Sequence, residues 1–162
     1  MNISLKSKKA LVGGSSKGLG NAVAYQLAMS GASVTLVSSN KDRLIKTVND
    51  LRNKTGINHD YLVVDYNNFE DYKKIIKKYL DTNPIDILIN NASNDERHSL
   101  EQITEKYWDD RMAINLKHYL FSIQAVKKSM INNKGGSIIN LGSVSWVMSL
   151  IHISEPTRPS TI

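Results

Sequence analysis

Short apolar runs alternate with longer amphipathic segments along most of the chain. Each run is four or five residues long and is apolar at most positions, as expected of strands buried on both faces. These predicted strands lie at residues 10–13, 33–37, 61–64, 85–89 and 137–141. The segments between them repeat apolar positions at helical spacing and predict helices at residues 18–30, 42–54, 69–80 and 104–131.

This alternation indicates a single α/β domain. Strands that are joined by helices run parallel, because a helical crossover returns the chain to the same end of the sheet. The helices then cover both faces of the sheet. We therefore predict a doubly wound parallel sheet whose pattern breaks off after about five strands, and no repeat or interdomain linker interrupts it.

The composition is that of an ordinary globular domain. Of the 162 residues, 41% are hydrophobic and 22% are charged, and the formal net charge is +6. The basic excess is densest at residues 72–80, where lysines alternate with isoleucines at helical spacing and predict a solvated helix face. A basic patch with interleaved aromatic residues or a nucleic-acid reading motif is not evident, so no nucleic-acid partner is expected.

Several other classes of site are excluded by residue content. The sequence has no cysteine, which excludes disulfides and thiolate metal sites, and its four histidines lack metal-ligand spacing. No apolar run approaches the roughly 18 residues needed to cross a bilayer, and the first residues lack an apolar leader core. We therefore expect a cytoplasmic protein without a metal or a membrane partner.

Three glycines follow the first predicted strand and open the first predicted helix, in the pattern Gly14-x-x-x-Gly18-x-Gly20. The first permits a tight turn, the second lets backbone approach a pyrophosphate, and the third permits close packing of helix on strand. The helix N-terminus adds free N–H groups and a positive dipole end. The loop predicts a nucleotide-binding site, and the alternative is a turn that needs glycine for structural reasons alone.

The end of the second predicted strand indicates which nucleotide is bound. An NAD site usually has an acidic residue there, which bonds the adenosine ribose. This chain instead has hydroxyl, amide and basic groups, at Ser38, Ser39, Asn40, Lys41 and Arg43. Together with the Lys17 cation in the glycine loop, they favour the 2′-phosphate of NADP over NAD. The alternative interpretation is that Lys41 and Arg43 are only solvent-exposed residues in the first turn of a helix.

The glycine spacing resembles that of the classical short-chain dehydrogenases/reductases, and further motifs agree in order and spacing. Asp65 follows the third strand, "NNAS" ends at Ser93 after the fourth, Asn115 lies in the long helix, and "GGSIINLGSVS" contains Ser143. The resemblance covers about residues 5–147 and implies a Rossmann-type fold. It also implies hydride transfer between a nicotinamide cofactor and a small-molecule ketone or secondary alcohol; reduction of a 3-oxoacyl thioester is one common activity of the family.

The resemblance implies roles for individual residues. Ser143 would hydrogen-bond the substrate oxygen, and Asn115 would hold a water in a proton relay. Cofactor contacts are expected from Gly14, Ser16, Lys17, Gly18, Leu19, Gly20, Ser38, Ser39, Asn40, Asp65, Tyr66, Asn91, Ala92 and Ser93. Ser93 departs from the family's usual glycine and adds a Cβ and a hydroxyl near the expected ribose position. Without the resemblance, Asp65 could be a turn former, and Asn90 and Asn91 could cap a turn.

One part of the family pattern is missing from the sequence. The catalytic Tyr-x-x-x-Lys pair would begin about a dozen residues after Ser143, but the chain there reads "SLIHISEPTRPSTI". Tyr107 precedes Arg111 at that spacing and is interpreted as packing on a helix face. We expect residues 1–148 to be an incomplete nucleotide-binding domain and residues 149–162 to be a tail unrelated to the family.

Three hypotheses therefore stand for the chain. It is part of a short-chain oxidoreductase and inactive in its 162-residue form, or a non-catalytic nucleotide-binding module, or a non-functional gene fragment. The complete oxidoreductase is expected to form a homo-oligomer, with the helix at residues 104–131 at the interface. The incomplete sheet is expected to leave the fifth strand with an open edge and exposed apolar surface.

Overall fold

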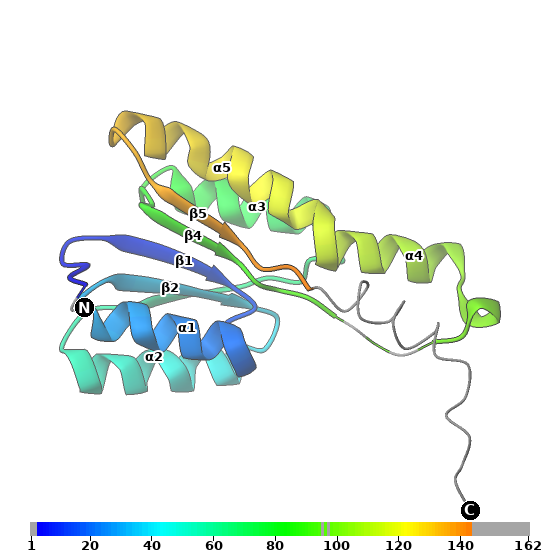
Figure 1. Cartoon of the computed structure of the whole chain (residues 1–162), viewed down its shortest axis with the longest axis horizontal. Coiled ribbons are helices and arrows are strands. Elements are labelled where there is room, and N and C mark those ends of the chain that lie inside the picture. Colours follow the sequence, from blue (N-terminus) through cyan, green and yellow to red (C-terminus); the bar gives the residue numbers. More distant parts are fainter. Residues whose placement is uncertain (1–2, 95, 97, 144–162) are drawn as a thin grey trace, which may run out of the picture.

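The computed structural model describes residues 3–94, 96 and 98–143, which form a five-stranded sheet with helices on both faces (Figure 1). The strands are β1 (Lys9–Gly13), β2 (Ser33–Ser38), β3 (Asp60–Val63), β4 (Ile87–Asn90) and β5 (Ser137–Asn140). The helices are α1 (Gly18–Met29), α2 (Lys41–Thr55), α3 (Phe69–Leu80), α4 (Glu105–Met112) and α5 (His118–Asn132), with a 3₁₀ turn η1 (Leu100–Gln102) and a π turn η2 (Ala113–Lys117). The predicted tail at residues 149–162 lies outside the described residues.

All five strands are parallel, in the order β3-β2-β1-β4-β5. From β1 the chain adds β2 and β3 on one side of the sheet. It then adds β4 and β5 on the other side of β1, so the strand order reverses between β1 and β4. The predicted doubly wound α/β fold is confirmed. Ligands of such sheets bind at the carboxyl ends of the strands, where the order reverses.

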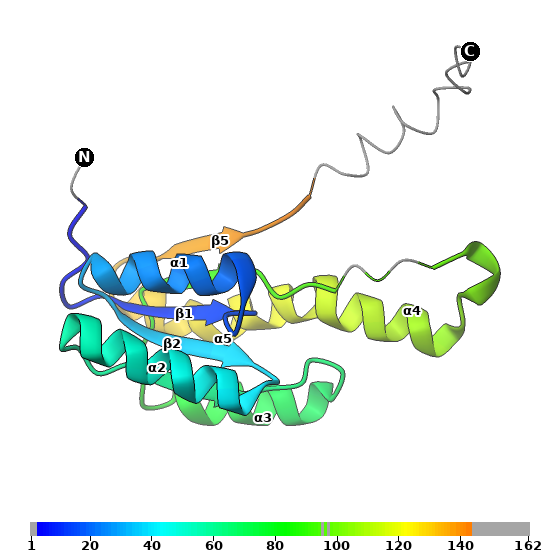
Figure 2. The same ribbon diagram turned by 90° about the horizontal axis from the view of Figure 1, so that it is seen from below.

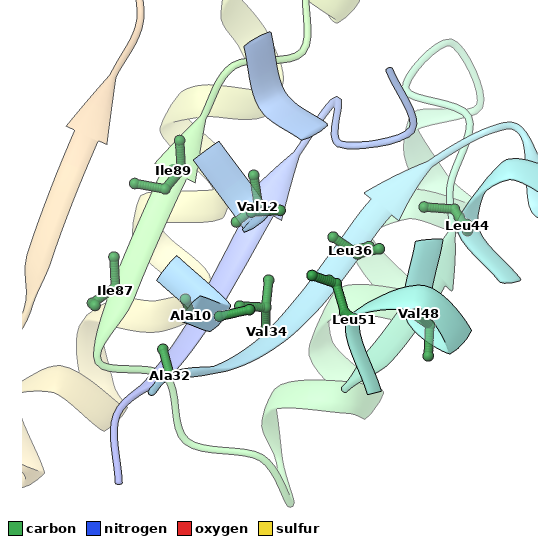
Figure 3. Packing of buried hydrophobic residues seen from close by; sticks show 12 residues of the cluster. Ala10, Val12, Ala32, Val34, Leu36, Leu44, Val48, Leu51, Ile87 and Ile89 are labelled. Atoms are coloured by element: carbon green, nitrogen blue, oxygen red, sulfur yellow. The ribbon is translucent and has the colours of Figure 1, made fainter. Parts of the chain in front are cut away.

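Two hydrophobic cores lie on opposite faces of the sheet, because successive strand side chains point to opposite sides. Ala10 and Val12 of β1 belong to the core under α1 and α2, whereas Leu11 belongs to the core under α3 and α5. Figure 3 shows the first core, where strand residues meet Leu44 and Leu51 of α2. The residues of both cores are buried, and the central strands that carry them position the loops at the carboxyl edge of the sheet.

Side-chain caps explain where three of the helices begin. Asn40, Asn68 and Thr104 each accept a hydrogen bond from the backbone N–H three residues further along. Gly56 ends α2 in the left-handed conformation, with a φ of 69°. Within the described part of the chain, α1 has no such cap at Lys17. The N–H groups at the start of α1 therefore remain available to an anionic ligand.

The predicted helical stretch over residues 104–131 is present, and a π turn divides it into two α-helices. The α4 helix ends at Met112, five residues follow in π conformation, and α5 begins at His118. Asn115 lies at the centre of this π turn. A π turn adds only one residue to a helical turn, so the apolar spacing stays close to helical and gave no sign of the break.

The apolar positions of this helical stretch divide between core and surface. Val126 is fully buried, whereas Trp108, Leu116 and Leu120 have exposed fractions of 57–58%. The α4 helix projects beyond the carboxyl edge of the sheet (Figure 2). The homo-oligomer stays a prediction. The exposed apolar residues are part of the surface that such an interface would use. Within the described residues, no helix combines the length and apolar character needed to cross a membrane.

The β5 strand forms one edge of the sheet. Among the described strands it pairs with β4 alone. Its residues are exposed, with exposed fractions of 40% for Ile138 and 51% for Ile139. The described part of the structure thus agrees with the predicted open edge and exposed apolar surface.

Candidate functional site

A groove of about 820 Å³ opens where the strand order reverses. Its lining comes from the loops after β1, β2, β3 and β4 and from the π turn η2. Every residue predicted to contact the cofactor lines this groove except Gly20. The sequence analysis left out three further lining residues, Val64, Asn94 and Ile114. Each is the immediate neighbour of a predicted residue, and that adjacency was the only signal the sequence offered.

The three glycines of the loop are needed for different reasons. Gly14 has a φ of +66°, and a Cβ at this position would lie 2.7 Å from the Cα of Ala92. A Cβ on Gly20 would lie 2.4 Å from both the Gly14 carbonyl oxygen and Nδ2 of Asn91. Gly18 has a φ of +59°, and no described atom lies within 4 Å of its Cβ position. Gly14 and Gly20 therefore let the loop pack against the end of β4, and Gly18 leaves open space over the loop for a ligand.

Two adjacent asparagines join the end of β4 to the strands on either side. Nδ2 of Asn91 donates to the carbonyl oxygens of Gly13 and Gly14, each at 3.3 Å. Nδ2 of Asn90 donates to Oδ1 of Asn140 at 2.8 Å. The alternative that both asparagines only cap a turn does not account for these bonds, because they connect β4 to β1 and β5.

A buried serine fixes the glycine loop to β2. Oγ of Ser15 accepts from the Val37 N–H at 2.9 Å, and the Ser15 N–H donates to the Val37 carbonyl at 3.2 Å. The next residue, Ser16, accepts a hydrogen bond from the Ser38 hydroxyl at 2.8 Å. The sequence analysis missed Ser15, because a serine in a turn is ordinary and only its partner in β2 reveals its function.

Hydroxyl and cationic groups gather where the groove passes the end of β2. Lys17 and Arg43 both line it, together with Ser38 and Ser39. Lys41 is exposed at the first position of α2 and is not among the lining residues. The two basic candidates after β2 therefore differ, and only Arg43 faces the groove.

The two residues after β3 border the groove in different ways. Oδ1 of Asp65 accepts from the Asn67 N–H at 2.9 Å, so this carboxylate forms a turn as well as lining the groove. The Tyr66 ring is buried and packs on the His118 ring, with centroids 4.0 Å apart. Burial raises the pKa of the Tyr66 hydroxyl and lowers the pKa of His118 to about 4, because each charged form would lose its hydration. Both rings are neutral at pH 7.

The Asn115 side chain bonds to the segment that follows β4. Its Oδ1 accepts from the Asn94 N–H at 2.7 Å, and its Nδ2 donates to the Asn94 carbonyl at 3.0 Å. Both ends of the Asn115 side chain thus bond to the backbone of Asn94, one of the residues that line the groove. Its part in a proton relay stays a prediction.

Ser143 follows β5 by three residues and is exposed. The Tyr119 hydroxyl donates to the Leu141 carbonyl at 2.9 Å and ties the chain before Ser143 to α5. Tyr119 lies four positions after Asn115, so adjoining turns of the same helical stretch contact the segments after β4 and β5. Neither Asn115 nor Ser143 is among the lining residues of the groove, and their catalytic roles stay predictions.

A parallel sheet with its groove at the strand reversal and a glycine loop after β1 defines a dinucleotide-binding class of protein. The short chain dehydrogenase family matches residues 8–155 of the sequence. The chain therefore belongs to the short-chain dehydrogenase/reductase family, as the motifs in the sequence indicate.

Individual relatives span a range of substrates. The D-xylose 1-dehydrogenase of Caulobacter vibrioides is 35% identical over 147 residues, which are 91% of this chain and 58% of that enzyme. A 3-oxoacyl-[acyl-carrier-protein] reductase of Staphylococcus epidermidis is 32% identical over 144 residues, 88% of this chain and 59% of the reductase. The L-sorbose reductase of Gluconobacter frateurii, solved with NADPH and L-sorbose, superposes with a TM-score of 0.84 at 26% identity, over 91% of this chain and 57% of that one. The chain thus spans less than two thirds of the length of these relatives.

Proposed function

We propose that the chain is the cofactor-binding part of an NADP-dependent oxidoreductase that interconverts a ketone and a secondary alcohol. NADP(H) supplies the hydride acceptor or donor of such a reaction. In the oxidative direction, a C–H bond of the alcohol breaks with loss of the hydride, the O–H proton passes to a general base, and the carbonyl forms. The complete protein supplies that base.

The glycine loop is the observation that carries this proposal. Gly14 and Gly20 bring the loop against β4, and the space beside Gly18 stays open at the uncapped start of α1. A pyrophosphate fits there, because N–H groups face it and no Cβ blocks its approach. Gly56 has the same open space at the end of α2, but only Gly18 of the two lines the groove.

NADP is favoured over NAD by the charge of the lining. Lys17 and Arg43 border the groove at the end of β2, beside the hydroxyls of Ser38 and Ser39. A 2′-phosphate carries negative charge and accepts hydrogen bonds from such groups. The NADPH complex of the L-sorbose reductase supports the same cofactor.

The substrates named for the relatives support a reaction class. D-Xylose, L-sorbose and a 3-oxoacyl group share a carbon–oxygen centre that gains or loses a hydride. Reduction of a 3-oxoacyl thioester stays one candidate within this class. We further propose that residues 1–162 by themselves bind NADPH without turnover, because their sequence contains no Tyr-x-x-x-Lys pair.

Cofactor titrations test the proposal. NADPH should bind the 162-residue chain and the complete protein at least tenfold more tightly than NADH, and Arg43→Ala should remove most of that preference. Loss of one charge-assisted hydrogen bond corresponds to roughly a tenfold change in affinity. Lys46→Ala removes a cation one turn further along α2 that does not line the groove, and it should preserve the preference. Equal binding of the two cofactors, or equal effects of the two variants, would contradict NADP specificity, and no binding of either would contradict the function.

A further inference from the structure

A second hollow, the α3–α5 cleft, lies between α3 and α5 on the face of the sheet opposite α1 and α2 (Figure 1). Its volume is about 690 Å³, and no residue lines both the cleft and the groove at the strand reversal. The two helices are joined at the cleft, where the hydroxyl oxygens of Tyr72 and Ser122 lie 2.6 Å apart and are buried. The cleft is therefore separate from the proposed cofactor site.

The floor of the cleft consists of two rows of side chains at helical spacing. Tyr72, Ile76 and Leu80 follow one another at intervals of four residues along α3, and Phe121 and Ala125 do so along α5. Residues four apart lie on the same face of a helix, one turn from each other. The α3 row alone extends for about 12 Å, so the floor is an apolar strip that follows the helices.

Lysines line the cleft on both of its sides. Lys73 and Lys77 belong to α3 and Lys128 to α5, and all three are exposed. The two α3 lysines each pair with a carboxylate of the same segment, at 2.8 and 3.8 Å. Within the described residues Lys128 has no ion-pair partner, and the sequence of residues 113–134 contains four lysines and no acidic residue. The α5 side therefore carries positive charge that the helix itself does not neutralise.

The recessed surface continues past Lys128. A smaller hollow of about 230 Å³ shares Gln124, Lys128 and Asn132 with the cleft and extends to Ile131. Ile131 has an exposed fraction of 64%. A ligand that covers both hollows is therefore extended, and it meets apolar surface on either side of the Lys128 cation.

The distribution of charge distinguishes between classes of ligand. Because lysines lie on both sides of the apolar strip, a complementary ligand needs an apolar stripe with negative charge on both of its flanks. A fatty acid has one carboxylate at one end of its chain and can pair with only one side. An amphipathic helix with acidic flanks presents its apolar stripe between two rows of carboxylates, and such helices bind in apolar grooves.

We propose that the α3–α5 cleft is the docking surface for an acidic amphipathic helix of a partner protein. Apolar side chains of that helix pack on the floor of the cleft, and its carboxylates pair with the lysines on both sides. The exposed apolar residues Trp108, Leu116 and Leu120 do not line the cleft, so this surface differs from the one expected at a homo-oligomer interface. The inference goes beyond the proposed oxidoreductase and does not depend on its cofactor or substrate.

Binding of a designed peptide to the complete protein tests the docking surface by fluorescence anisotropy. The probe is a labelled peptide of about 18 residues, long enough to form a helix, with leucines along one face and glutamates on both flanks. We expect a micromolar Kd at low salt that weakens roughly tenfold at about 0.5 M NaCl, because salt screens exposed charge pairs. A peptide with lysine at every glutamate position should bind at least tenfold more weakly. No binding of the acidic peptide, or equal binding of both peptides, would overturn the inference.

Two matched variants locate the peptide on the protein. Lys128→Glu and Lys78→Glu each reverse one exposed lysine, so they change the net charge equally, but only Lys128 lines the cleft. Lys128→Glu should weaken binding of the acidic peptide roughly tenfold and strengthen binding of the basic peptide, a gain that loss of folding would not produce. Lys78→Glu should change either Kd by about twofold at most. Melting temperature and NADPH affinity should stay unchanged in both variants. Equal effects of the two variants would overturn the assignment to the cleft.

Two further measurements identify other occupants of the cleft. Sedimentation of the complete protein should give the same oligomeric state for wild type and Lys128→Glu. Loss of the oligomer in Lys128→Glu would assign the cleft to a contact between copies of the chain. Binding of dodecanoate without binding of the acidic peptide would assign it to an anion with a single head group. Either of these two outcomes would overturn the inference and leave the proposed oxidoreductase in place.

Discussion

The two walls of the groove are built in opposite ways. The glycine wall, residues 13–20, approaches the groove with backbone, and a Cβ on Gly14 or Gly20 would collide with the neighbouring loop. The polar wall, residues 91–94, is held by side-chain hydrogen bonds. Asn91 bonds to the end of β1, and Asn115 and Arg111 bond to the backbone of Asn94. The walls meet where the Asn91 amide donates to the carbonyls at the end of β1. Added atoms should therefore damage the glycine wall, and removal of hydrogen-bonding atoms should damage the polar wall.

Gly20→Ala should have the largest effect, because it adds an atom where the walls meet. The new Cβ would lie 2.4 Å from a backbone oxygen of the glycine wall and from the Asn91 amide. The oxygen belongs to backbone and cannot move like a side-chain end. We expect the free energy of unfolding to fall by about 3 kcal/mol, at the upper end of overpacking costs. NADPH binding should be lost, as measured by urea denaturation and cofactor titration.

The control for this substitution is Gly142→Ala, since no described atom lies within 4 Å of that Cβ position. It should change neither stability nor cofactor binding by a measurable amount. If Gly20→Ala bound NADPH as tightly as Gly142→Ala, close approach of the two walls would not be a requirement of the site.

The glycine wall was predictable from sequence, and the support of the polar wall was not. Glycine spacing after an apolar run reports a backbone requirement that few other structures impose, so the loop between β1 and α1 could be located from Gly14, Gly18 and Gly20. Part of the support for the polar wall comes from Arg111, whose guanidinium bonds to Glu96 and to Asn94, 15 and 17 positions earlier in the chain. Arginine on a helix is common, and only the folded chain identifies its partners.

The second prediction concerns a buried histidine that packs against the groove residue Tyr66. His118, which packs under Tyr66 at the start of α5, has its pKa lowered to about 4 by burial. The unfolded chain binds a proton near pH 6.5 and the folded chain does not, so stability is fully present above pH 6.5 and is lost as the pH falls toward 4. The expected loss is about 2 kcal/mol at pH 5 relative to pH 7.

Urea denaturation of wild type and His118→Phe at both pH values measures this contribution. Phe keeps a ring among the rings of Tyr66 and Tyr119 but cannot titrate. Burial also lowers the pKa of His59, which adds pH dependence of the same sign in both proteins, so the difference between them isolates His118. An unchanged slope in His118→Phe would mean that His118 accepts a proton in the folded protein without cost.

The fold itself followed from the apolar pattern, because strands buried on both faces have few alternatives. Ala10, Val12 and Leu11 in β1 fill the two cores that such a strand requires. The π turn at Asn115 was not predicted within the helical stretch, since one additional residue in a turn hardly alters the apolar period. The sequence resemblance singled out Asn115, but it did not predict the hydrogen bonds between its side chain and the Asn94 backbone.

The smallest expected effect separates backbone strain from ligand space within the glycine wall. Gly18 and Gly56 have φ values of +59° and +69°, and neither has a described atom within 4 Å of its Cβ position. Alanine at either position should therefore cost about 1 kcal/mol of stability, because the left-handed conformation is strained for a residue with a Cβ. Only Gly18 lines the groove, whereas Gly56 ends α2. Gly18→Ala should thus weaken NADPH binding by roughly tenfold or more, and Gly56→Ala should leave it unchanged. Equal losses of NADPH affinity in both variants would mean that general destabilisation causes the effect. The open space beside Gly18 would then not support a bound phosphate.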